Sequence, residues 1–145
     1  LQVRKAAEGL PIDEHVNLPQ EELEDLYGQA SIYWHATGYG QSARRFPIWF
    51  EHYGISVIEA MSAKAVPVVF EVGGPATTVR NQLDGIHWGS LEELVEVTVS
   101  LVEDQNYREE LGSNAQQRAL DFDRKVFNER VQMIFSAGRE QERVS

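Results

Sequence analysis

The chain has 145 residues, of which 42% are hydrophobic and 25% are charged, so it is long enough for one globular domain and is not composed like a disordered segment. Its formal net charge is −10, with acids gathered in the runs EELED and SLEELVEVTVSLVED, which argues against binding to nucleic acid or to anionic lipid. It has no cysteine, which excludes disulfides and thiolate chemistry, and no apolar run of the length that crosses a bilayer.

Segments rich in β-branched and aromatic residues alternate with segments of helical period along residues 11–88. Between the first two of them, the apolar residues Leu23, Leu26 and Tyr27 recur at the spacing of one helix face. The later run VPVVFEV is apolar throughout, as in a strand that is covered on both faces. This alternation predicts an α/β fold with a parallel sheet and right-handed crossovers. The predicted strands are residues 11–17, 31–36, 66–72 and 85–88, and a further helix is predicted over 75–83.

The last third of the chain is predicted to be helical. Ser90 and Glu93 have the spacing of a capping box at the start of the first of these helices. A second helix is expected over residues 107–120, and a third helix is expected to be capped by Asp123. Residues 139–145 are expected to fray. Four apolar side chains of the third helix are expected to point inward, namely Phe127, Val131, Ile134 and Phe135.

A long connection over residues 37–53, rich in Gly, Arg and aromatic residues, follows a predicted strand, which is where α/β proteins place binding sites. A helix is expected to begin near Ser56, so its first N–H groups are unpaired and can face an anion. Gly54 allows the backbone to approach a ligand closely. Glu51 and Glu59 are expected to reach the same crevice from either side of this helix start. Two carboxylates around a row of amide donors suit a sugar nucleotide, which has hydroxyls at both ends and phosphate between them.

These residues also have simpler interpretations. Ser56 and Glu59 are three positions apart and can form a capping box. Glu51 can be an exposed loop acid, and Gly54 can serve only a turn. The arginine pair at 44–45 can contact phosphate or stay solvated at a loop tip. A non-catalytic α/β interaction module therefore remains an alternative.

The stretch EHYGISVIEAMSAKAVPVVFEVGG, residues 51–74, resembles the donor-binding segment of retaining GT-B glycosyltransferases of the family 4 type, the glycosyl transferases group 1. The similar features are two glutamates eight positions apart, an aromatic-glycine-aliphatic step, Ala-Met, a strand entered by Pro-Val-Val and a Gly-Gly turn. The resemblance extends over about residues 9–135 and implies part of a Rossmann-like C-terminal domain. It departs from the family at Lys64, where Gly is usual, and at Thr77, where an acid is common.

The resemblance implies a role for each site residue. Glu51 is the catalytic candidate and would hydrogen-bond the transferred sugar near the reacting centre. The amides around Gly54, Ile55 and Ser56 would face the diphosphate, and Glu59 would hold the ribose hydroxyls. The reaction implied is transfer from a nucleoside diphosphate sugar with retention, without a cofactor or a catalytic metal. No metal-ligand spacing joins the four histidines, and only His35 is expected to face the crevice; the others are His15, His52 and His87.

The resemblance also predicts what lies outside residues 1–145, which we expect to be a single, N-terminally truncated domain. The family's basic pair at the diphosphate and its N-terminal acceptor domain are not in this sequence, so we expect the chain alone to bind donor weakly and to transfer nothing. In the family's strand order 3-2-1-4-5-6 the strands here are the third to sixth, so either the first of them packs directly on the second or an unpaired edge is left, which a second copy can join. The whole protein is expected in the cytoplasm, either free or peripheral to a membrane. Another GT-B sugar-nucleotide enzyme, such as an epimerase, is the other alternative.

Overall fold

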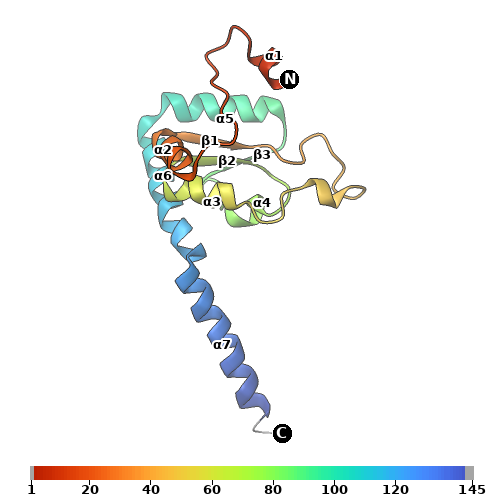
Figure 1. The fold of residues 1–145 in the computed structure, drawn as a ribbon, viewed down its shortest axis with the longest axis vertical. Coiled ribbons are helices and arrows are strands. Elements are labelled where there is room, and N and C mark those ends of the chain that lie inside the picture. The colour runs from red at the N-terminus through yellow and green to blue at the C-terminus, as the bar shows by residue number, and fades with distance from the viewer. Residues whose placement is uncertain (1, 143–145) are drawn as a thin grey trace.

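Three parallel strands form the sheet of the computed structural model, which describes residues 2–142 (Figure 1). They are β1 (Ile32–His35), β2 (Val66–Phe70) and β3 (Ile86–Trp88), and they lie side by side in that order. Every residue of the central strand β2 is buried, as its apolar sequence predicts. The structure confirms the predicted α/β fold with a parallel sheet, and the three strands occupy the places expected for the fourth to sixth strands.

Helices cover both faces of this sheet (Figure 1). The helix α5 lies on one face, α3 lies on the other, and α6 packs against both helices. One short 3-10 helix lies within the long connection, and another follows α6. No helix in the described part of the chain is both long and apolar enough to cross a membrane. The helices are α1 (Gln2–Ala7), α2 (Gln20–Gln29), η1 (Pro47–Trp49), α3 (Ile55–Ser62), α4 (Pro75–Thr78), α5 (Leu91–Glu103), α6 (Gln105–Ala119), η2 (Leu120–Phe122) and α7 (Arg124–Glu142).

The two faces of the sheet bury two separate apolar clusters. On the α5 face, Leu101 packs with Phe70 of β2 and Trp88 of β3. On the α3 face, Val57 and Met61 pack with Val69 of β2 and with the small residues of α6. Because successive residues of a strand point to opposite faces, β1 and β2 supply both clusters, whereas β3 supplies only the one on the α5 face. The sheet beside which α3 begins is therefore packed against apolar side chains on both of its faces.

Side chains cap the helices α5 and α6. The hydroxyl of Ser90 accepts from the N–H of Glu93 at 3.2 Å, and the carboxylate of Glu93 accepts from the N–H of Ser90 at 3.3 Å, so the predicted capping box is confirmed. The carboxylate of Asp104 accepts from the N–H of Tyr107 at 2.9 Å. This second cap starts α6 two residues before the start that periodicity predicts.

Residues 11–17 form no strand, so this prediction is wrong. They run as irregular, exposed backbone, in which the side chains of Ile12 and Val16 are 55% and 60% exposed. A strand needs a neighbour to receive its backbone hydrogen bonds, and the described residues supply none beside this segment. Strand β1 therefore forms one edge of the sheet, and no described strand pairs with its outer side.

Three of the four apolar side chains of α7 that were predicted to point inward are exposed, which corrects a second prediction. The helix leaves the body of the protein after its first turn (Figure 1), so no described element covers it further along. The exposed fractions of its apolar side chains reach 65% for Phe127, 71% for Ile134 and 65% for Phe135, whereas Val131 is half-buried. The helix continues to Glu142, into the tail that we expect to fray, and residues 143–145 lie outside the described residues.

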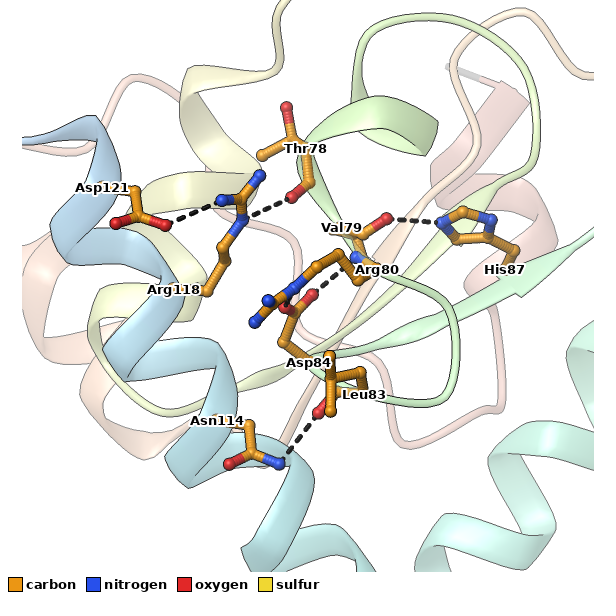
Figure 2. Close-up of polar contacts among 9 residues, drawn as sticks. All are labelled: Thr78, Val79, Arg80, Leu83, Asp84, His87, Asn114, Arg118 and Asp121. Atoms are coloured by element: carbon orange, nitrogen blue, oxygen red, sulfur yellow. Dashed lines mark hydrogen bonds and ion pairs between the residues drawn. The ribbon is translucent and has the colours of Figure 1, made fainter.

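Only the first part of the helix predicted over residues 75–83 is present, because α4 ends at Thr78. Asp84 is fully buried and closes the following turn by accepting from the backbone N–H of Arg80 at 2.6 Å and by pairing with its guanidinium (Figure 2). Arg118 of α6 donates to the carbonyl oxygen of Thr78 at 3.2 Å (Figure 2). The bond of Arg118 ties α4 to α6, and the contacts of Asp84 close the turn that follows α4.

Candidate functional site

The segment that carries the two glutamates folds as a turn that leads into α3. Gly54 is the N-cap of this helix and has φ 83° and ψ 56°, a left-handed conformation that favours glycine. A Cβ at Gly54 would lie 3.0 Å from the ring of Pro75. Glycine is therefore needed here both for the backbone conformation and for the close approach of α4. The interpretation that Gly54 serves only a turn is incomplete. The first N–H groups of α3, those of Ile55 and Ser56, have no acceptor within the helix.

The carboxylate of Glu51 folds back over this helix start. Its Oε1 accepts from the N–H of Tyr53 at 3.1 Å. Hydrogen bonding from the backbone N–H of Tyr53 lowers the pKa of Glu51, with further contributions from Gly54 and His52, and burial opposes the shift only in part. Glu51 is thus an ionised carboxylate at neutral pH. It can accept hydrogen bonds from a ligand or face a developing positive charge, but it is not a proton donor.

A Gly-Gly turn after β2 packs directly on the backbone of Glu51. The N–H of Gly74 donates to the carbonyl oxygen of Glu51 at 2.7 Å. Gly73 has φ +96°, and a Cβ there would lie 2.6 Å from the same carbonyl oxygen. The hydroxyls of Thr77 and Thr78 donate to the carbonyl oxygen of Gly74. The loop that follows β2 therefore packs on the backbone of Glu51, in the loop that follows β1, at the carboxyl end of the sheet.

A cavity of about 330 Å³ opens beside Glu51. The Gly-Gly turn forms one wall of it and the long connection forms the other, so it lies at the carboxyl edge of the parallel strands, where α/β proteins bind ligands. Arg44 and Arg45 are both exposed in the long connection, next to residues of this wall. The lining residues are Ala43, Pro47, Phe50, Glu51, His52, Val72, Gly73 and Gly74.

Glu59 lies on a different side of α3. Its Oε2 accepts from the hydroxyl of Tyr27 in α2 at 3.3 Å, and it lines depressions of about 250 and 380 Å³, neither of which includes Glu51. The structure therefore does not bring the two carboxylates into one cavity. Burial, with the neighbouring Tyr33 and Glu59, raises the pKa of Tyr27 to about 12, so its hydroxyl remains a donor to Glu59.

The capping-box interpretation of Glu59 is excluded, because Gly54 and not Ser56 is the N-cap. Ser56 is already inside the helix, and its hydroxyl accepts from that of Tyr33 in β1 at 2.9 Å. Sequence reasoning missed Tyr27 and Tyr33 as site residues and treated Tyr27 as a core position. Their contacts join residues 32 and 23 positions apart, which no local pattern reveals.

Lys64, the departure from the family pattern just after α3, adopts the left-handed conformation with φ 69°. It is the second residue after the helix end, the position where glycine is common. The lysine side chain makes this backbone less favourable by about 1–2 kcal/mol than glycine would. Lys64 follows the end of α3, whereas Glu51 precedes its start, so this departure lies at the opposite end of the helix from Glu51.

The histidines have different surroundings. His52 and His87 lie near backbone carbonyl oxygens, at 3.4 Å from that of Pro47 and 2.9 Å from that of Val79. His35 is only 6% exposed and neither of its ring nitrogens has a partner. Burial lowers the pKa of His35, although the carboxylate of Glu51 opposes this shift. In residues 2–142 no three or more His, Asp or Glu side chains gather as ligands of a metal ion.

The family model of the glycosyl transferases group 1 matches residues 2–118 of the chain. Among curated proteins, the human enzyme GDP-Man:Man(3)GlcNAc(2)-PP-Dol alpha-1,2-mannosyltransferase is 30% identical over 96 residues, which cover 63% of this chain and 17% of that enzyme. Its counterpart from Xenopus laevis is 33% identical over 67 residues, covering 46% of this chain and 12% of the other. The chain thus spans less than a fifth of the length of these relatives.

Two solved structures share the fold. Sucrose-phosphate synthase from Thermosynechococcus elongatus superposes with a TM-score of 0.73 at 19% identity, covering 99% of this chain and 33% of that one. Anabaena HepE in complex with UDP-glucose superposes with a TM-score of 0.70 at 19% identity, covering 94% of this chain and 36% of that one. At these identities the likeness shows the fold alone.

Proposed function

The chain belongs to the glycosyl transferases group 1 family, and from this premise we propose that it is the donor-binding part of a retaining glycosyltransferase. The reaction is transfer of a sugar from a nucleoside diphosphate sugar to an acceptor. The observation that carries the proposal is the ionised carboxylate of Glu51, which lies between the start of α3 and a cavity of about 330 Å³ at the carboxyl edge of the sheet. An acceptor-only group beside unpaired amides suits a sugar that is joined to a diphosphate.

The residues take separate parts in this reaction. Glu51 accepts hydrogen bonds from the transferred sugar and faces the positive charge that grows at its anomeric carbon. The N–H groups of Gly54, Ile55 and Ser56 point toward the diphosphate, whose charge a helix start stabilises. Glu59 holds the ribose hydroxyls from the other side of α3, with its carboxylate oriented by the hydroxyl of Tyr27.

The donor class is supported by the names of the similar proteins. The human relative is named for GDP-mannose, and HepE was solved with UDP-glucose. Both are nucleoside diphosphate sugars. The human relative's acceptor is named as a dolichol-linked oligosaccharide, so we extend the proposal to a whole protein that works in the cytoplasm at a membrane surface, with its acceptor site in a separate N-terminal domain.

Two substitutions in the whole protein test these roles, with transfer of labelled sugar as the readout. Glu51→Gln keeps the shape and removes the charge, and we expect at least about a hundredfold loss of kcat, the scale of losing one electrostatic group at the reacting centre. Glu59→Gln is expected to raise the KM for donor with a smaller change of kcat. Glu129→Gln on the exposed side of α7 is the matched control. Unchanged kinetics in both site variants would refute the assigned roles.

The isolated chain provides a separate test of its dependence on the rest of the enzyme. A helix start favours an anion by only about 0.3–1 kcal/mol, or up to about 2 when partly buried. The chain carries a net charge of −10, so we expect its affinity for a nucleoside diphosphate to be weaker than micromolar and its transfer activity to be absent. Isothermal titration with GDP and UDP measures this, and micromolar binding would show that the chain needs no outside cations.

The free edge of β1 supports one further partner, a second copy of the isolated chain. We expect sedimentation equilibrium to give a mass that rises with concentration above the 16.4 kDa of one copy. A Pro substituted for Trp34, which removes an N–H from the open side of this edge strand, is expected to lower that tendency. A constant monomer mass at millimolar concentration would contradict the proposed pairing.

A further inference from the structure

His35 is a buried imidazole without a hydrogen-bonding partner. It is 6% exposed, and both of its ring nitrogens are buried. In the described part of the chain, only His35 and Trp88 bury side-chain nitrogen or oxygen atoms that have no partner. Buried polar groups in proteins are nearly always paired, so a group without a partner requires an explanation.

The position of His35 in the sheet places it beside the candidate site. It is the last residue of β1, and Tyr33, two residues before it on the same face, donates to Ser56 of α3. His35 therefore lies on the α3 face, at the carboxyl end of its strand. Glu51 is close enough for its charge to act on the ring. Trp88, in contrast, belongs to the cluster on the α5 face.

The long connection that follows β1 covers this end of the sheet. Gly38 and Gly40 near its beginning have φ +90° and +77°, so two left-handed glycines lead the chain away from His35. Phe50 at its other end packs against Gly38 and stacks on Phe70 of β2. The stretch between these ends also forms one wall of the cavity beside Glu51. A movement of this stretch would enlarge the cavity from Glu51 toward His35.

We propose that His35 is a further donor-binding residue, whose imidazole forms hydrogen bonds with a hydroxyl of the transferred sugar when residues 37–49 move aside. This inference rests on the proposed function. A neutral imidazole has one N–H donor and one acceptor nitrogen, and a sugar hydroxyl likewise donates and accepts. A phosphate offers only acceptors, and the adjacent Glu51 would repel it. The sugar hydroxyl is thus the part of the donor that suits both His35 and Glu51.

The first test observes the imidazole directly. The chain, labelled with ¹⁵N-histidine, is titrated to millimolar concentration with UDP-glucose and GDP-mannose, and in parallel with UDP and GDP, which lack the sugar. Each histidine signal is assigned by substitution. We expect a nucleotide sugar to shift the His35 ring nitrogens, while the matching diphosphate binds and leaves them unchanged. Equal shifts from sugar and diphosphate would overturn the assignment to a sugar hydroxyl.

The second test uses His35→Leu, which replaces the imidazole by an apolar side chain of similar size. Because the nitrogens have no partner in the fold, we expect the variant to melt at the same or a higher temperature than the parent chain. We expect it to bind the nucleotide sugar about fivefold more weakly, the effect of one neutral hydrogen bond, with unchanged affinity for the diphosphate. His87→Leu is the matched control, since it loses a hydrogen bond to a backbone carbonyl and should melt lower without a change of affinity.

The outcomes separate this inference from the proposed function. If neither the parent chain nor the whole protein binds nucleotide sugars or diphosphates at millimolar concentration, the proposed donor site fails, and the role of His35 fails with it. If the donor binds, but His35→Leu binds it as tightly as the parent chain does, only the role of His35 fails. A lower melting temperature with full donor affinity would make His35 a residue of the fold and would also refute the inference.

Discussion

The substitution Gly73→Ala tests whether the Gly-Gly turn holds Glu51 in place. A Cβ at position 73 would lie 2.6 Å from the carbonyl oxygen of Glu51, and real Cβ atoms essentially never approach closer than 3.0 Å. The two loops must therefore separate by at least about 0.4 Å. The hydrogen bond from Gly74 to the same carbonyl, now 2.7 Å long, has to lengthen or bend with this movement.

The expected cost of Gly73→Ala has two parts. Alanine in the left-handed conformation at φ +96° costs about 1–2 kcal/mol, and overpacking typically costs about 1–3 kcal/mol. For a chain of 145 residues this corresponds to a drop of the melting temperature on the order of 10 °C. A displacement of about 1 Å can lower a rate about a hundredfold, so even the smaller shift at Glu51 is expected to reduce transfer at least about tenfold.

Thermal unfolding of the chain and transfer kinetics of the whole protein, measured well below the midpoint, are the assays. Gly28→Ala in α2 is the control, because nothing lies within 4 Å of its added Cβ and the residue is helical. This control is expected to be more stable by about 0.5–1 kcal/mol, with unchanged transfer. If Gly73→Ala melts and transfers like the parent, the close packing of the turn on Glu51 is not what positions the carboxylate.

Three further predictions concern the scaffold. Ser90→Ala removes the capping box of α5 and should lower the free energy of unfolding in urea by about 1 kcal/mol, whereas Ser113→Ala in α6 should not; equal effects would contradict this. Arg118→Met loses the hydrogen bond to Thr78 and should lower the free energy of unfolding by about 1–2 kcal/mol in the same assay. An unchanged free energy of unfolding would show that this bond does not hold α4 in place. Because the pKa of folded His35 is lowered, the unfolded chain takes up this proton first, so stability is full above about pH 6.5 and falls as the pH drops below it. His35→Leu should flatten this part of the melting temperature's pH profile, and an unchanged profile would exclude His35 as its origin.

The elements that were predictable from the sequence are those with local causes. The capping box at Ser90 depends on two residues three positions apart, and the central strand β2 on one short apolar run. The start of α3 follows from Gly54 and the helical period after it. In each case the residues that decide the structure are also neighbours along the chain, so their pattern is visible in the sequence.

The wrong predictions depend on partners that lie elsewhere. Residues 11–17 have the composition of a strand, but no described strand lies beside them. The apolar stripe of α7 predicts a buried face, but that helix leaves the body. Likewise, Tyr27 reaches Glu59 only because α2 and α3 pack side by side. A periodic pattern gives the face of an element, and the tertiary fold decides whether anything covers that face.

In a complex with the donor, two anions would share the start of α3, namely the carboxylate of Glu51 and the diphosphate. The carboxylate of Glu51 already accepts from the N–H of Tyr53, and the N–H of Gly54 also contributes to its low pKa. The amide of Gly54 is one of those expected to face a diphosphate. Two unit charges 4 Å apart repel by about 4 kcal/mol at an effective dielectric constant of 20, which exceeds what a helix start contributes to an anion. Donor binding should therefore turn the carboxylate of Glu51 from these amides toward the sugar, where its free oxygens can accept from hydroxyls, and leave the amides to the phosphate.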